Sequence, residues 1–148
     1  MNKIRIIFLV VAVLLVIFFL FFYWDFLDKD ANGRYSIAEL SSNNTQSRIY
    51  IKKKVWGMTN DNQIIVISGT NEKEFVADKS KNYIYEGIMP FFYKLQGDTL
   101  SIYTMVASKV PIDLKTNFNI VQIELENPQM MDLIEHDNYK TKELSVIN

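Results

Sequence analysis

The sequence contains no cysteine and a single histidine among its 148 residues. The missing thiols exclude disulfides, thiolate nucleophiles, cysteine-ligated zinc and lipids attached through cysteine. One histidine, His136, is too few for a metal site built from several histidines. A folded domain in this chain must therefore be held together by core packing, and its set of catalytic side chains is small.

An excess of charge of one sign is also missing. The formal net charge is −1 and the isoelectric point is about 5.8. Nucleic-acid-binding proteins normally present a basic face, so we expect no nucleic-acid partner. The sequence has no nucleophile-elbow motif and no internal repeat, and we expect no enzyme activity from it. Nothing in the composition indicates an oligomeric state.

The longest uncharged stretch covers residues 6–24, which contain no proline and no glycine. As a helix these 19 residues would be about 28 Å long, which fits the ~30 Å hydrocarbon core of a membrane. We therefore predict an uncleaved transmembrane helix, a signal-anchor, that contacts membrane lipid. A cleaved signal peptide is the alternative, but its apolar region is shorter and ends in small residues, whereas this one ends in Tyr23 and Trp24.

Charges on either side of this stretch predict its orientation. Lys3 and Arg5 precede it, and Asp25, Asp28 and Asp30 follow it. The positive-inside rule then places residues 1–5 in the cytoplasm and the rest of the chain outside it. We expect a single-pass protein of the cell membrane, with an extracytoplasmic C-terminal domain that is periplasmic or extracellular.

Residues 28–39 carry the one motif with defined chemistry. They match the pattern D-x-[DN]-x-[DN]-G-x5-E at every specified position. Calcium prefers six to eight oxygen ligands, and this spacing supplies them from carboxylates, an amide, a backbone carbonyl and a hydroxyl. The expected metal ligands are Asp28, Asp30, Asn32, Arg34 (through its carbonyl oxygen), Ser36 and Glu39.

This segment resembles the calcium-binding loop of an EF-hand. The resemblance covers about 15 residues and implies Ca²⁺ as a ligand, held weakly, that would stiffen the segment after the helix. EF-hand loops normally occur in pairs, and the sequence has no second one. The alternative is a turn rich in Asp and Asn with solvated charges.

The remaining chain predicts a mainly β protein. Residues 25–47 would form a juxtamembrane segment with the calcium-type motif and a polar linker, and residues 48–148 would form a small antiparallel β-sandwich or barrel-like domain. A Gly97-Asp98 turn between alternating runs predicts a tight hairpin. The other predicted strands cover residues 48–56, 64–67, 75–77, 83–85, 119–126 and 144–146, with one or two helical turns over 129–135.

Two side-chain clusters have alternative interpretations. Alternation along the strand puts Lys52 and Lys54 on one face and Lys53 on the other. We expect these lysines on a solvated edge that discourages aggregation, with contact to anionic lipid as the alternative. The aromatic residues around 83–93 favour a sheet buried on both faces, with an exposed aromatic patch as the alternative.

The expected function is that of a membrane-anchored extracytoplasmic binding or accessory module. Such a module is compatible with a protein partner. One alternative is a calcium-responsive structural stalk. Another is a hydrolase that uses two carboxylates from Glu124, Glu126 and Glu135, although their positions along a strand and a helix favour simple solvation.

Overall fold

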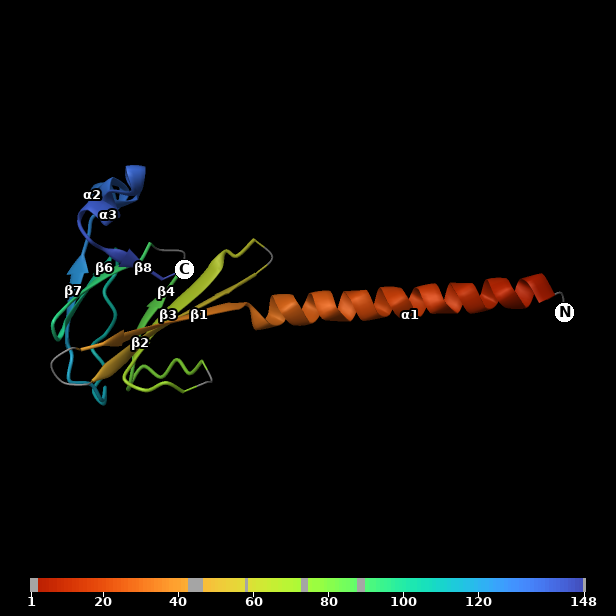
Figure 1. Ribbon diagram of the computed structural model, residues 1–148, viewed down its shortest axis with the longest axis horizontal. Coiled ribbons are helices and arrows are strands. Elements are labelled where there is room, and N and C mark those ends of the chain that lie inside the picture. The colour runs from red at the N-terminus through yellow and green to blue at the C-terminus, as the bar shows by residue number, and fades with distance from the viewer. Residues whose placement is uncertain (1–2, 43–46, 58, 73–74, 88–89, 148) are drawn as a thin grey trace.

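A computed structural model describes residues 3–42, 47–57, 59–72, 75–87 and 90–147, with backbone alone for residues 3–6 and 24–32. A long N-terminal helix projects from a β domain, and short helices lie near the C-terminus (Figure 1). The elements are α1 (Lys3–Asn32), β1 (Arg34–Ser41), β2 (Arg48–Trp56), β3 (Asn62–Ser68), β4 (Tyr83–Glu86), β5 (Phe92–Gln96), β6 (Thr99–Thr104), β7 (Asn119–Glu124), α2 (Asn127–Ile134), η1 (Glu135–Asp137), α3 (Asn138–Thr141) and β8 (Ser145–Val146).

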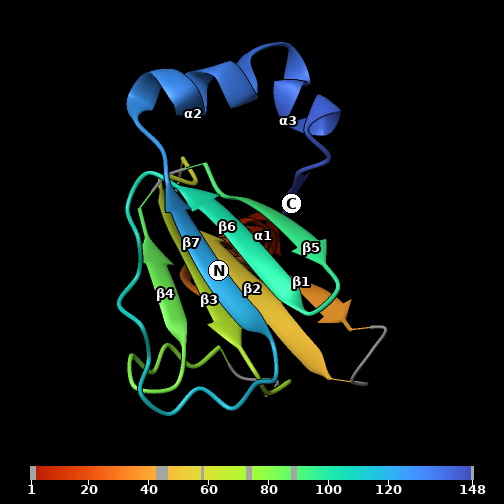
Figure 2. The ribbon, with the colours of Figure 1, turned by 90° about the vertical axis from the view of Figure 1, so that its left-hand side faces the viewer.

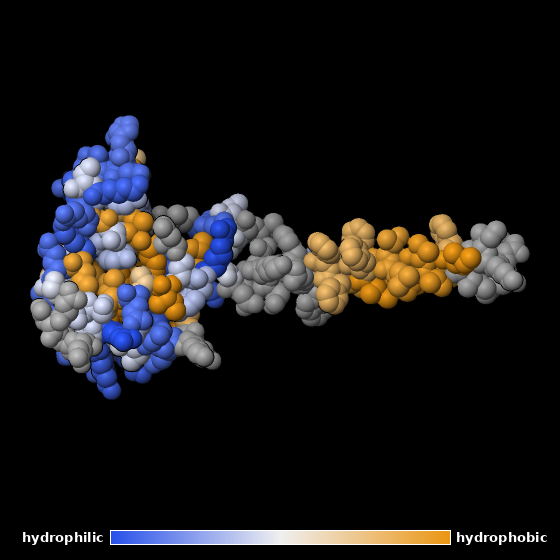
Figure 3. Space-filling view, in the orientation of Figure 1, coloured by the Kyte–Doolittle hydropathy of each residue, from blue (hydrophilic) through white to orange (hydrophobic). Residues whose placement is uncertain are grey.

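The side chains of α1 are apolar and exposed over residues 7–23 (Figure 3). Val13, the least exposed of the large apolar side chains there, is still 49% exposed. Among the described side chains, no helix has the length and apolar character needed to cross a membrane.

This finding overturns several sequence predictions. On this result three predictions are wrong: a transmembrane helix over residues 6–24, its role as a signal-anchor, and localisation at the cell membrane. The helix itself is longer than predicted, since α1 begins at Lys3 and ends at Asn32.

The β domain consists of two four-stranded sheets, with strand orders β1-β2-β3-β4 (sheet A) and β7-β6-β5-β8 (sheet B). Sheet A is antiparallel throughout, but β7 pairs in parallel with β6 in sheet B (Figure 2). The prediction of a purely antiparallel domain is therefore wrong. The 14 residues between β6 and β7 are long enough to return the chain to the start of the sheet, as a parallel connection requires.

The main core lies between the two sheets. Ile49, Ile51, Ile65 and Ile67 point inward from sheet A, where alternate residues of a strand share a face. Sheet B contributes side chains that are equally buried, among them Leu100 and Ile102, which are both 0% exposed. The core also contains Tyr83, Tyr85, Phe91, Tyr93, Phe118 and Ile147.

A second apolar cluster forms where α2 packs on the outer face of sheet B. Phe92 points outward from β5 and is covered by Met130, Leu133 and Leu144. The helix begins with a capping box between Glu126 and Gln129. All five aromatic residues of the cluster at 83, 85 and 91–93 are thus buried. Four of them lie in the core between the sheets, and Phe92 lies under α2 on the outer face of sheet B, which confirms the favoured interpretation of a sheet buried on both faces for sheet B.

Strand β1 occupies residues that the sequence assigned to a calcium-type loop and a linker. It pairs antiparallel with β2 from Arg34↔Val55 to Ser41↔Arg48. The β domain therefore includes residues before 48. The linker residues 43–46 lie outside the described part of the chain.

Candidate functional site

The calcium-type motif does not have the backbone of a calcium loop. Such a loop wraps twelve consecutive residues around one ion. Here the backbone of Asp28, Asp30 and Asn32 forms the last turns of α1. The structure does not describe their side chains. Gly33, with φ of +65°, ends the helix. The chain then continues directly as the extended strand β1, so the two halves of the motif diverge.

The other predicted ligands make contacts of their own. The guanidinium of Arg34 donates to Asn60 Oδ1 at 3.0 Å. Glu39 pairs with Arg48 at 2.8 Å on the surface, and Ser36 lies in the middle of β1. Among the described side chains, no group of three or more His, Asp or Glu residues is placed to hold a metal ion. On these findings the description of this segment as an EF-hand-like, calcium-binding loop is wrong for the described residues. Calcium as a ligand of Asp28, Asp30 and Asn32 stays a prediction, because their side chains lie outside the described ones.

A buried cation lies elsewhere, in the middle of β2. Lys52 is 3% exposed, and its neighbour on the same face, Tyr50, is 7% exposed. Both point away from the core between the sheets, because Ile49 and Ile51 occupy the inward positions. The predicted solvated edge is wrong, since β2 is an inner strand of sheet A.

The segment between β3 and β4 covers this outer face of sheet A. Near its start, Ser68 Oγ accepts from Thr70 N at 3.2 Å and donates to Thr70 O at 3.1 Å. Further along, Asp78 accepts from Ser80 N at 2.9 Å and from Ser80 Oγ at 2.7 Å, which forms a tight turn. These local hydrogen bonds fix the backbone near both ends of the cover, and Lys52 Nζ is tied to it through the Glu72 carbonyl at 3.0 Å.

The connection between β6 and β7 forms the opposite wall. Asp113 N donates to Ser80 O at 2.9 Å, which joins this connection to the cover. Lys115 O lies so close to Gly69 that a Cβ atom there would be 1.9 Å away. Glycine is needed at this position because the two chain segments meet backbone to backbone.

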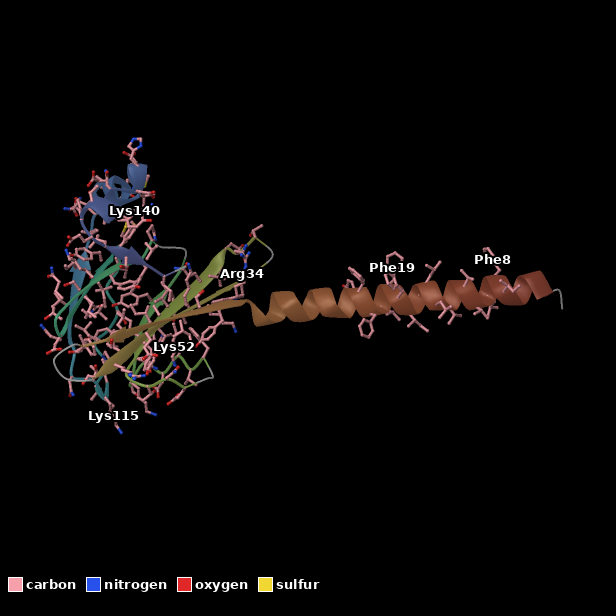
Figure 4. All side chains as sticks on the ribbon, viewed as in Figure 1. Phe8, Phe19, Arg34, Lys52, Lys115 and Lys140 are labelled. Carbon is pink, nitrogen blue, oxygen red and sulfur yellow. The ribbon has the colours of Figure 1, made fainter. Side chains whose placement is uncertain are left out.

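Together these three parts border a partly open cavity of about 580 Å³. Its floor is buried and polar, with Lys52, Ser68 and Asn82 exposed by 3%, 6% and 7%. Its rim carries charges of both signs on exposed or half-buried side chains. Figure 4 shows Lys52 inside the β domain and Lys115 at the domain's lower margin. The charged rim residues are Glu72, Asp78, Lys81, Asp113 and Lys115.

The ammonium of Lys52 has spare hydrogen-bonding capacity. Nζ donates to the backbone carbonyl of Glu72 at 3.0 Å, its one hydrogen bond within the described part of the chain. An ammonium group carries three N–H donors. Burial lowers the pKa of Lys52, while the nearby Glu72 carboxylate acts in the opposite direction and favours the charged form. The site thus combines a desolvated cation with open space beside it.

On the rim, Asp78 is already committed to local contacts. The hydrogen bonds from Ser80 and the nearby Lys81 ammonium, 3.5 Å from Oδ2, hold the pKa of this carboxyl below its usual value. Asp78 therefore stays ionised and stabilises the local turn. It does not pair with Lys52. No signal in the sequence identified this site, because it depends on two long connections folding over one strand.

The carboxylates proposed for hydrolysis do not converge. Glu124, Glu126 and Glu135 are all exposed. Glu124 accepts from Ala107 N at 3.1 Å, and Glu126 belongs to the capping box of α2. His136 is exposed too, in a left-handed backbone conformation with φ of +51°. These three glutamates thus do not form the carboxylate pair in a cleft that a glycoside-type hydrolase needs.

Comparisons of this chain with protein-family models, with curated proteins and with solved structures found no match. A functional proposal for this protein therefore depends on the geometry of the Lys52 cavity.

Proposed function

We propose that this protein is a non-catalytic binding module whose Lys52 cavity takes a small polar molecule through a carboxylate group. The observation that carries the proposal is Lys52, a lysine residue that is 3% exposed, borders a cavity and makes one hydrogen bond through Nζ within the described part of the chain. A carboxylate would accept the remaining N–H donors and neutralise a charge that is costly to bury alone.

The size of the cavity agrees with a small ligand. Its volume of about 580 Å³ falls within the ~300–1,000 Å³ that small-molecule sites usually have. Its lining combines the polar floor with the apolar side chains of Val76 and Leu114, which fits a small molecule that carries several hydrogen-bonding groups at one end.

The charges around the cavity favour a carboxylate of low overall charge. Among the described lining residues are three lysines, 52, 81 and 115, and three acidic residues, 72, 78 and 113. The formal charges of floor and rim together cancel, so the cavity does not attract a multiply charged anion such as a phosphate ester. An amino acid or another small molecule with both a carboxylate and a cationic group matches this arrangement of charges.

The test is calorimetric titration of the full chain, kept in solution with a non-ionic detergent, with glycine, glutamate and succinate as probes. We expect at least one carboxylate to bind and its amide counterpart to bind much more weakly. Lys52→Met should weaken binding by roughly 10–100-fold, the equivalent of one charge-assisted hydrogen bond.

The matched control is Lys79→Met, which removes a lysine whose side chain is 76% exposed and leaves the cavity unchanged. It should bind the probe like the unaltered chain. Absence of binding by all three carboxylates, or equal binding by the Lys52→Met variant, would contradict the proposal.

A further inference from the structure

The amine of Lys52 has a fixed place beside open space. The side chain leaves β2 in the middle of an inner strand, between β1 and β3, and its Nζ donates to the carbonyl oxygen of Glu72 at 3.0 Å. The residue is 3% exposed, yet it borders the partly open cavity of about 580 Å³. Figure 4 shows it inside the β domain. A small molecule that enters the cavity therefore meets an amine in a defined position.

Burial favours the neutral form of this amine. Desolvation lowers the pKa of Lys52, and the nearby Glu72 carboxylate opposes this effect only in part. A neutral amine has the lone pair that attacks a carbonyl carbon, whereas an ammonium does not. Desolvated lysines in enclosed sites are the ones that form Schiff bases in proteins. The environment of Lys52 thus suits a nucleophile as well as a cation.

The hydrogen bonding around Nζ fits the product of such a reaction. An ammonium has three N–H donors, whereas a protonated imine on the same nitrogen has one. Within the described part of the chain, the carbonyl oxygen of Glu72 is the one acceptor that Nζ contacts. The protonated imine keeps this hydrogen bond and leaves no further N–H to satisfy. Its positive charge would lie near the Glu72 carboxylate, which already favours a cation at this position.

We propose that Lys52 captures a small polar aldehyde or ketone as a protonated imine in this cavity. The neutral amine attacks the carbonyl carbon, the π bond between carbon and oxygen breaks, and one proton passes from nitrogen to oxygen. The new hydroxyl takes a proton from solvent and leaves as water while the carbon–nitrogen double bond forms. Overall, an ammonium and a carbonyl compound give a protonated imine and one water molecule, with no change of charge or oxidation state.

This reaction goes beyond the carboxylate binding proposed above and does not depend on it. A carboxylate binds the charged ammonium and supplies acceptors to its N–H groups. A carbonyl compound reacts with the neutral amine and reduces the number of N–H groups. The buried polar floor at Ser68 and Asn82, which are 6% and 7% exposed, favours a polar carbonyl compound over a long apolar aldehyde.

The test is competitive labelling of the full chain in non-ionic detergent with a limiting amount of acetaldehyde and sodium cyanoborohydride. The reductant converts each imine into a stable secondary amine, and fragmentation mass spectrometry gives the labelling rate of each lysine. At neutral pH we expect Lys52 to be labelled at least about threefold faster than Lys79, although the Lys79 side chain is 76% exposed. Above about pH 10 this advantage should disappear, because exposed lysines then become neutral too.

The matched control is the same labelling in guanidinium chloride, in which Lys52 and Lys79 of the unfolded chain should react at similar rates. Equal or slower labelling of Lys52 in the folded chain overturns the proposal, whether the probe fails to enter or the amine stays charged. An advantage of Lys52 that persists in the unfolded chain overturns it too, because the local sequence would then be the cause. Acetaldehyde carries no carboxylate, so this proposal and the carboxylate proposal fail separately.

Discussion

At the scale of single residues, Gly69 controls how closely the two walls of the Lys52 cavity approach. Any side chain at this position would collide with the carbonyl oxygen of Lys115. A backbone contact of this kind cannot be relieved by a change of rotamer, so the wall itself has to move.

Gly69→Ala should therefore destabilise the fold by about 1–3 kcal/mol, the usual cost of overpacking, and should also weaken ligand binding in the Lys52 cavity. The measurement is urea unfolding, in which we expect a lower midpoint with an unchanged slope. An unchanged midpoint would show that the contact between Gly69 and Lys115 is not close in solution.

Tyr85 gives a prediction about pH. Its hydroxyl donates to Gln122 Oε1 at 2.7 Å, and burial raises its pKa. The unfolded chain therefore loses this proton first, near the ordinary tyrosine pKa of about 10. The folded state then holds the extra proton, and the free energy of unfolding falls as pH rises above that value.

Tyr85→Phe should cost about 0.5–1.5 kcal/mol at neutral pH, because one hydrogen bond is lost. Above about pH 10 the difference between the two proteins should shrink, because the variant has no phenol to ionise at this position. Urea unfolding at neutral and alkaline pH measures both values. A difference that stays constant over this range would contradict a buried Tyr85.

At the scale of elements, α2 depends on its N-terminal cap. The backbone N–H of Glu126 donates to Gln129 Oε1 at 2.9 Å, and the helix covers Phe92 through Met130 and Leu133. Gln129→Ala should lower stability by about 0.5–2 kcal/mol. Glu135→Ala, at the other end of the helix, should change it by less than about 0.5 kcal/mol. Thermal unfolding of both variants tests the comparison.

The junction of α1 and β1 leads to a prediction about calcium. Because the motif of residues 28–39 is divided between a helix and a strand, we expect millimolar calcium to leave the thermal unfolding midpoint unchanged. Glu39→Gln should lower stability by about 1 kcal/mol or less, since the pair with Arg48 is exposed. A calcium-dependent rise in the midpoint that Glu39→Gln abolishes would contradict the observed backbone.

Several elements were predictable because their signals are local. Strand β2 has the predicted limits, Arg48–Trp56. The hairpin of β5 and β6 turns at Gly97-Asp98, with φ of +59° at the glycine. Strand β1 was not predicted, because residues 28–39 match the calcium-type pattern and were interpreted as a loop. In addition, the apolar residues of β1 do not alternate cleanly with polar ones. Residues 75–77 were wrongly predicted as a strand: they form no strand and belong to the irregular segment over sheet A.

At the scale of the whole molecule, the candidate site was beyond the reach of sequence patterns. The alternation of residues along β2 correctly predicted that Lys52 and Lys53 lie on opposite faces of the sheet. On the inner face, Lys53 Nζ donates to Ile147 O at 2.9 Å. Alternation could not indicate that residues 69–72 and 75–82 fold back over one of these faces. The parallel pairing of β6 and β7 was not predicted for the same reason. The pairing and the cavity both depend on the paths of long connections, which a local pattern does not indicate.

The most direct test of the proposed function is NMR titration of the lysine side chains in the full protein. We expect one lysine to lose its proton at a lower pH than the others, and its signal to be missing in Lys52→Met. Addition of a carboxylate that binds should raise the pKa of this lysine, because the anion favours the charged form. If every lysine titrates at the ordinary value, or if the binding carboxylate leaves the Lys52 pKa unchanged, Lys52 is not a buried cation that binds the ligand.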